Sequence, residues 1–86
     1  MKLEGRLFSA NLVIKVETIE QPDSRERWVR QLENCLIGLC RQLEVPLPLW
    51  LEKNTHEFAR FHQTLFFADQ FIEPVRFDRM QIRLLG

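Results

Sequence analysis

The sequence predicts an α+β fold in which a three-stranded sheet, antiparallel or mixed, carries its helices on one face. Two alternating segments near the N-terminus, one amphipathic segment in the middle and one alternating segment near the C-terminus support this prediction. The predicted order is strand, strand, helix, helix, an optional third helical turn, and strand. Residues 1–86 are expected to form one domain, because no linker, repeat or low-complexity tract divides them.

The first two strands are expected over residues 2–8 and 12–19, joined as a β-hairpin. The second segment alternates apolar and charged side chains, namely Leu12, Ile14 and Val16 against Lys15 and Glu17. Asn11 can take the left-handed conformation that a short hairpin loop needs. Gly5 indicates a bulge or a close approach of another segment to the first strand.

A long helix is expected to open in the segment QPDSRERW and to end before VPLP. Asp23 or Ser24 can cap its N-terminus, and Glu26 would complete a capping box with Asp23. One face of this helix carries the apolar stripe Trp28, Leu32, Cys35, Leu36, Leu39 and Leu43. Pro46 and Pro48 cannot continue the helix.

The chain from Pro48 to His62 is expected to be helical, as one kinked helix or as two short ones. Pro48 suits a first helical turn, and Asn54 with Glu57 could form a second capping box. The next segment, TLFFADQF, predicts a loop and one more helical turn.

The last strand is expected in VRFDRMQIRLL. There Met80, Ile82 and Leu84 alternate with Arg79, Gln81 and Arg83. One of the two strands nearest the chain ends should form an edge of the sheet, where small domains find partners.

Composition excludes several classes of function. Twelve basic and twelve acidic side chains cancel, so no general attraction to nucleic acid or to anionic membranes is expected. Charges interrupt the N-terminal segment, and no apolar stretch reaches the length of a membrane span, so a cytoplasmic protein is predicted. Cys35 and Cys40 would point about 140° apart on one helix, which favours two buried thiols over a disulfide.

No catalytic, cofactor or metal site is predicted. Glu52 and His56 share a helix face at the spacing of two metal ligands, but a third ligand is missing nearby. With three glycines the chain has no phosphate-binding loop, and carboxylates near the last strand show no sign of the burial that acid–base catalysis needs.

The aromatic segment Leu49–Phe67 allows two interpretations. A packed core where the second helical region meets the sheet is favoured. The alternative is a ligand-binding or catalytic pocket formed by Trp50, His56, Glu57 and Phe61.

Two further hypotheses concern surfaces of the sheet. Arg76, Arg79 and Arg83, placed on the last strand, could bind nucleic acid. Four apolar residues fall at positions where one sheet face leaves them exposed, so Val13, Ile19, Val75 and Phe77 are candidates for an interface.

The second half of the chain carries a Pro-x-Trp-Leu segment (Pro48 to Leu51), Asn54, the pair Glu57-Phe58, and FIEPVRFD before the last strand. On these elements it resembles a set of small bacterial proteins of Gram-positive type whose function is unknown. The first half matches them in its layout of hairpin and helix. The resemblance implies a stand-alone bacterial cytosolic domain and brings no activity, cofactor or catalytic residue to this chain.

The leading expectation is therefore a non-catalytic protein-interaction module, a homo-oligomer or the partner of another protein. Nucleic-acid binding through the arginine-bearing strand is the alternative, and the aromatic pocket is the third hypothesis.

Overall fold

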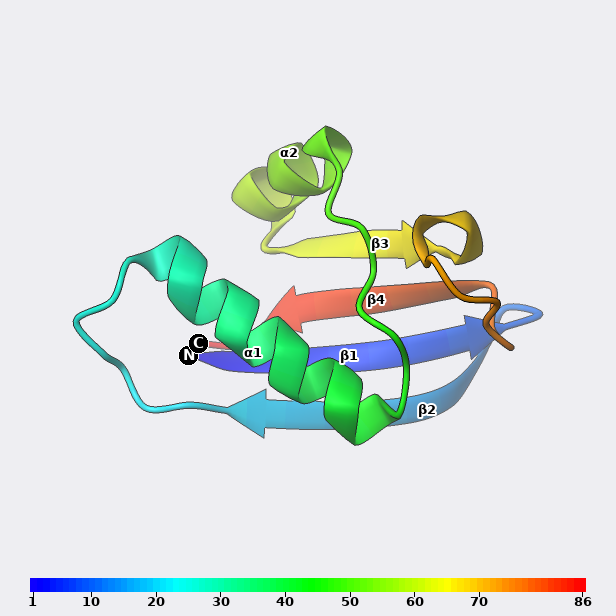
Figure 1. Cartoon of the computed structure of the whole chain (residues 1–86), viewed down its shortest axis with the longest axis horizontal. Coiled ribbons are helices and arrows are strands. Elements are labelled where there is room, and N and C mark those ends of the chain that lie inside the picture. The colour runs from blue at the N-terminus through cyan, green and yellow to red at the C-terminus, as the bar shows by residue number, and fades with distance from the viewer.

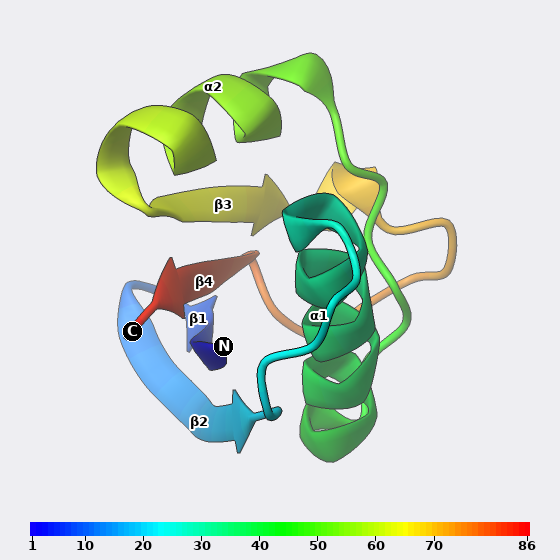
Figure 2. The same cartoon turned by 90° about the vertical axis from the view of Figure 1, so that its left-hand side faces the viewer.

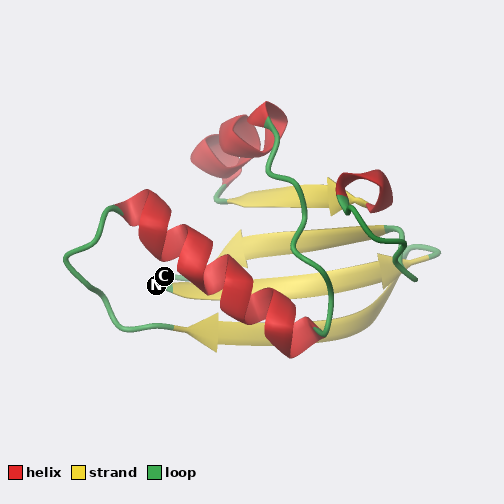
Figure 3. Cartoon of the chain, in the orientation of Figure 1, coloured by secondary structure: helices red, strands yellow, loops and turns green.

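The computed structural model describes residues 1–86 and contains two α-helices and one four-stranded antiparallel sheet (Figures 1 and 3). Its elements are β1 (Lys2–Ser9), β2 (Leu12–Glu20), α1 (Trp28–Leu43), α2 (Glu52–Phe61), β3 (Gln63–Phe67), a short 3₁₀ helix (Ala68–Gln70) and β4 (Arg79–Leu84). The sheet order is β2-β1-β4-β3. The strands nearest the chain ends are thus central, and the prediction that one of them forms an edge is wrong.

The three-stranded prediction is also wrong, because Gln63–Phe67 forms the additional strand β3 along β4. The sequence assigned a loop here. A short apolar run such as LFF shows no clear period, so periodicity does not separate a strand from other buried structure. The helical turn expected next to it is confirmed as the 3₁₀ helix.

The predicted hairpin is confirmed, with Ala10 and Asn11 in the left-handed region at φ 51° and 64°. The alternation of β2 left open which of its two faces meets α1, and the register answers this. The register between β1 and β2 shifts between Leu7 and Phe8, which inserts one extra residue into β2. The helix-facing positions of β2, which pair with Leu7, Gly5 and Leu3, are Lys15, Glu17 and Ile19.

Helix α1 begins later than predicted. Its N-cap is Arg27, which makes no side-chain capping bond, and the segment before it forms a loop in which Ser24 Oγ accepts a hydrogen bond from the Glu26 amide at 3.2 Å. The apolar stripe is confirmed: all its members after Trp28 are buried. Trp28 itself is half exposed.

Two glycines let α1 approach the hairpin. A Cβ atom on Gly5 would lie 2.8 Å from Leu39 Cδ2, and one on Gly38 would lie 2.4 Å from Ile19 Cδ1. The close approach predicted at Gly5 is confirmed. Ile19 packs partly buried against the core from β2, so it is not the exposed interface residue that the sequence predicted.

Helix α2 is one short helix that begins at Glu52, and Pro48 lies outside it in an isolated bridge with Phe71. Asn54 is the third helical residue, and its Oδ1 accepts a hydrogen bond from the Leu51 amide at 2.9 Å. The predicted capping box, with Asn54 as the N-cap and Glu57 as its partner, is therefore wrong. Asn54 lies in the first turn of the helix, and its side chain bonds the amide of the N-cap residue Leu51.

The two helices take different positions on the sheet. Helix α1 crosses the face over β1 and β2, whereas α2 runs along β3 (Figure 2). The opposite face of the sheet carries no helix (Figure 2). One core of fourteen buried residues joins α1, α2 and the sheet.

The segment before β4 belongs to this core. Phe77 is 7% exposed and meets Phe71 edge-on at 5.2 Å between ring centroids, and Val75 packs partly buried beside it. Both were predicted as exposed interface residues. That prediction is wrong because the chain leaves the strand direction before Arg79 and folds these side chains inward.

Candidate functional site

Four polar side chains between α2 and β3 form a connected hydrogen-bond cluster. Asn54 Nδ2 donates to Thr64 Oγ1 at 2.7 Å, and Thr64 Oγ1 donates to Glu57 Oε1 at 2.6 Å. Gln70 Nε2 donates to Asn54 Oδ1 at 3.1 Å and to the Leu49 carbonyl, also at 3.1 Å. Every buried side-chain polar atom of the protein has a partner. The cluster therefore fixes α2 against β3.

The predicted pocket residues are not brought together. Trp50 packs edge-on against Phe58, with 6.0 Å between ring centroids. His56 is exposed and lies 3.7 Å from Glu52, and the Glu57 carboxylate is held by Thr64. Phe61 is 59% exposed at the end of α2. The pocket predicted from these four residues is wrong, because successive positions on a short helix point in different directions.

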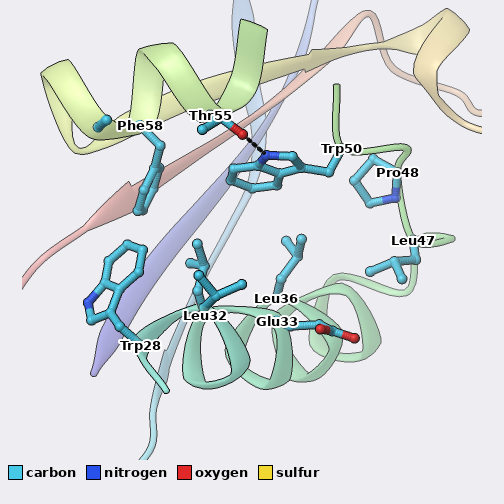
Figure 4. A pocket seen from close by; sticks show the side chains of 11 residues that line it. Trp28, Leu32, Glu33, Leu36, Leu47, Pro48, Trp50, Thr55 and Phe58 are labelled. Carbon is cyan, nitrogen blue, oxygen red and sulfur yellow. Dashed lines mark hydrogen bonds between the residues drawn. The ribbon is translucent and has the colours of Figure 1, made fainter. Parts of the chain in front are cut away.

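A different hollow lies between α1 and α2, with a volume of about 420 Å³ (Figure 4). We call it the interhelical groove. Eight of its eleven lining residues are hydrophobic. Trp28 and Phe58 stand at one end, Pro48 and Leu47 at the other, and Trp50 between them (Figure 4). Of these, the sequence associated Trp50 alone with a site, because Trp28 falls on the apolar stripe of α1 and looks like a core residue.

No group of three or more His, Cys, Asp or Glu side chains could hold a metal ion. Asp78 Oδ2 accepts a hydrogen bond from the Ala10 amide at 2.7 Å, which places it as a cap on the hairpin loop. Burial raises the pKa of the Cys40 thiol to about 12, and it also raises the pKa of Cys35 against the opposing effect of the terminal ammonium group. Both thiols are thereby kept protonated and unreactive.

The three arginines of the nucleic-acid hypothesis do not all lie on one strand. Arg76 lies in the loop before β4, so its placement on the strand is wrong. Arg79 and Arg83 lie on the bare face of the sheet with Gln81. The Arg79 guanidinium stacks 4.4 Å from the centroid of the Phe8 ring.

The edge of β3 is closed by side chains. The Leu65 carbonyl accepts hydrogen bonds from Asn54 Nδ2 at 2.9 Å and from Lys53 Nζ at 3.1 Å. The Phe67 amide donates to Gln70 Oε1 at 3.0 Å. Side chains of α2 and of the 3₁₀ helix therefore bond two of the backbone groups that this edge strand leaves unpaired, the Leu65 carbonyl and the Phe67 amide.

The edge of β2 is open. Met1 and Gln21 exchange two backbone hydrogen bonds, of 2.8 and 2.9 Å. In an antiparallel pair, hydrogen-bonded and non-hydrogen-bonded residue pairs alternate, so this pair shows which residues of β2 bond to β1 and which do not. By this alternation the amides and carbonyls of Val16, Thr18 and Glu20 point away from β1. No hydrogen bond from another part of the chain reaches them.

Apolar side chains gather on this open strand. Four of them are between 45% and 68% exposed: Leu12, Val13, Ile14 and Val16. We call this surface the β2 apolar edge. Of its members, the sequence named Val13 alone as an interface residue and grouped the other three on one face of the strand.

Comparison with protein-family models, with curated proteins and with solved structures finds no match to this chain. The resemblance drawn from the second half of the sequence therefore stays a prediction. No helix has both the length and the apolar character that crossing a membrane requires.

Proposed function

We propose that this protein is a non-catalytic interaction module that pairs with a second copy of itself along β2. The observation that carries the proposal is the contrast between the two sheet edges. Helix α2 runs along β3, and side chains bond its Leu65 carbonyl and Phe67 amide, whereas β2 offers free backbone groups beside the β2 apolar edge. An open strand edge with apolar side chains is a template for pairing with another strand.

The charge pattern of β2 favours an antiparallel pair with the two-fold axis at Val16. In that register Val16 faces its own copy, and its outward backbone groups form a hydrogen-bonded pair. Lys15 of one protomer then faces Glu17 of the other, twice by symmetry, so opposite charges meet across the axis. Glu17 makes no ion pair within its own protomer, and Lys15 Nζ donates to the Leu43 carbonyl at 3.0 Å but has no acidic partner there.

Light scattering coupled to size exclusion, at low and at high salt, tests the proposal. We expect twice the protomer mass at both salt concentrations, because the contact is formed by backbone and apolar groups. Val16→Lys places two like charges opposite each other at the axis and should give a monomer. Val29→Lys, at a valine on α1 that is still more exposed than Val16, should leave the dimer intact. A wild-type monomer at every concentration contradicts the proposal.

A second candidate function is binding of single-stranded nucleic acid on the bare sheet face. One observation favours it: Phe8, Arg79 and Phe67 lie directly across β1, β4 and β3 from one another. Aromatic rings beside arginine on a sheet face are the groups on which bases stack. Close pairing of Arg6 with Glu4, at 2.8 Å, weakens the positive charge of the same face.

Fluorescence anisotropy with a labelled single-stranded RNA tests this candidate. Binding should weaken steeply with salt, and Arg79→Glu and Arg83→Glu should each abolish it. Arg41→Glu, an exposed arginine on α1, is the matched control and should retain binding. Absence of binding at low salt removes the candidate.

A further inference from the structure

The interhelical groove has the size of a small-molecule site. Its volume of about 420 Å³ falls within the range of roughly 300–1,000 Å³ that ligand pockets occupy. An α-helix about 10 Å across rises about 5.4 Å per turn, so a single turn already fills a space on the order of 400 Å³. A partner helix would lie mostly outside the groove, whereas a small molecule can be enclosed by it.

The groove has an aromatic wall that is already in place. Ring centroids of Trp28 and Phe58 are 5.9 Å apart, and those of Trp50 and Phe58 are 6.0 Å apart. Trp50 Nε1 donates a hydrogen bond to Thr55 Oγ1 at 2.8 Å, which fixes the indole ring (Figure 4). Trp28 is 50% exposed and Trp50 36%, so both rings keep surface for a ligand.

The charge at the groove has one sign. Glu33 is the charged residue among its lining residues, and its carboxylate makes no hydrogen bond or ion pair (Figure 4). No lysine or arginine lines the groove. A carboxylate that lines the same groove as exposed aromatic rings attracts a cation and repels an anion.

We propose that the interhelical groove binds a small organic ammonium ion with an apolar body. The ammonium group lies between the Trp50 ring and the Glu33 carboxylate, and the alkyl or aryl body packs on Leu32 and Leu36 on the α1 side and reaches toward Trp28 (Figure 4). The tryptophan face is the strongest of the aromatic partners for such a cation. The inference is independent of pairing along β2, because the groove lies between the helices.

Three probes that share a hexyl group and differ in the charge of the head group separate the effect of charge on affinity from that of apolar contact. They are hexyltrimethylammonium, hexanol and hexanesulfonate. Both tryptophans of the protein line the groove, so tryptophan emission and the two indole N–H resonances report binding there. We expect the ammonium ion to bind about tenfold more tightly than the alcohol, and the sulfonate to bind more weakly than either. Equal affinities, a preference for the sulfonate, or no binding would overturn the proposal.

Two variants locate the site. Glu33→Gln removes the charge at an exposed position and should reduce the preference for the ammonium ion over the alcohol several-fold, with the affinity for the alcohol unchanged. Glu26→Gln, outside the groove, is its matched control. Ala59→Trp should fill the groove and abolish binding of both probes. If Ala59→Trp does not fold, Glu33→Gln still tests the proposal. An unchanged preference of Glu33→Gln for the ammonium ion over the alcohol would contradict the assignment of the site.

Discussion

Asn54 is fully buried and uses both ends of its amide. Its oxygen accepts from the Leu51 amide and from Gln70, and its nitrogen donates to Thr64 and to the Leu65 carbonyl. One side chain thereby joins the start of α2, the strand β3 and the 3₁₀ helix. In a low-dielectric interior each of these groups is costly to leave unpaired.

We expect Asn54→Ala to lower the free energy of unfolding by about 2–4 kcal/mol, because it leaves several buried donors and acceptors without partners. Urea denaturation followed by circular dichroism measures the change. Asn34→Ala on α1 is the control, because no hydrogen bond holds the Asn34 side chain and alanine favours the helix. A loss below about 1 kcal/mol in Asn54→Ala would contradict the role given to the cluster.

Cys40 makes stability depend on alkaline pH. Burial raises its pKa from 9.0 to about 12 in the folded protein, so the unfolded chain loses the thiol proton first. Unfolding is then favoured as pH rises above 9, by up to about 1.4 kcal/mol per pH unit. Between pH 8 and pH 10, wild type should lose about 1.4 kcal/mol more stability than Cys40→Ala. Equal losses in urea titrations of the two proteins would contradict this.

At the scale of single elements, the two glycines at the crossing of α1 and the hairpin decide how closely the layers pack. Gly5→Val adds a branched side chain where a Cβ alone would lie 2.8 Å from Leu39 and 3.0 Å from Leu43. Although valine favours strands, we expect a loss of about 1–3 kcal/mol from overpacking. Gln81→Val, on the bare face of the neighbouring strand, should be neutral or stabilising. Thermal unfolding of both variants tests the comparison.

Helices and strands with a strong hydrophobic period could be predicted from the sequence, whereas the contacts between these elements could not. The stripe of α1 and the alternation of β4 identify a helix and a strand because each pattern repeats over several turns or pairs. The strand β3 is five residues long and carries adjacent apolar side chains, so its period is too short to recognise. Alternation in β2 shows that the strand has two faces but not which face meets α1.

The candidate sites depend on contacts between elements that are distant in sequence. Trp28 and Trp50 belong to different parts of the chain, and only the packing of α1 beside α2 places them in one groove. The open edge of β2 likewise follows from the sheet order, in which β1 pairs with β4 and leaves β2 outside. Local patterns carry no information on either arrangement, whereas the burial of Cys35 follows from its place on the helical stripe.

At the scale of the whole molecule, the two proposed surfaces lie apart. The sheet order places β2 at one edge and β3, with α2 along it, at the other. Pairing along β2 would give a continuous eight-stranded sheet and would leave each interhelical groove on the side away from the two-fold axis. Association and ligand binding should therefore be separable: Val16→Lys should abolish the first and leave the second unchanged.

Pairing of folded protomers also makes thermal stability depend on protein concentration. Since the contact requires the folded edge of β2, mass action stabilises the dimer by roughly 0.7 kcal/mol per protomer for each tenfold rise in concentration. For a chain of this size that corresponds to an increase in Tm of about 3–5 °C. The Tm of Val16→Lys should stay constant over the same range, and that of Val29→Lys should rise as in wild type. Differential scanning calorimetry over a hundredfold range of concentration makes the measurement, and a Tm of wild type that does not move would exclude a dimer linked to folding.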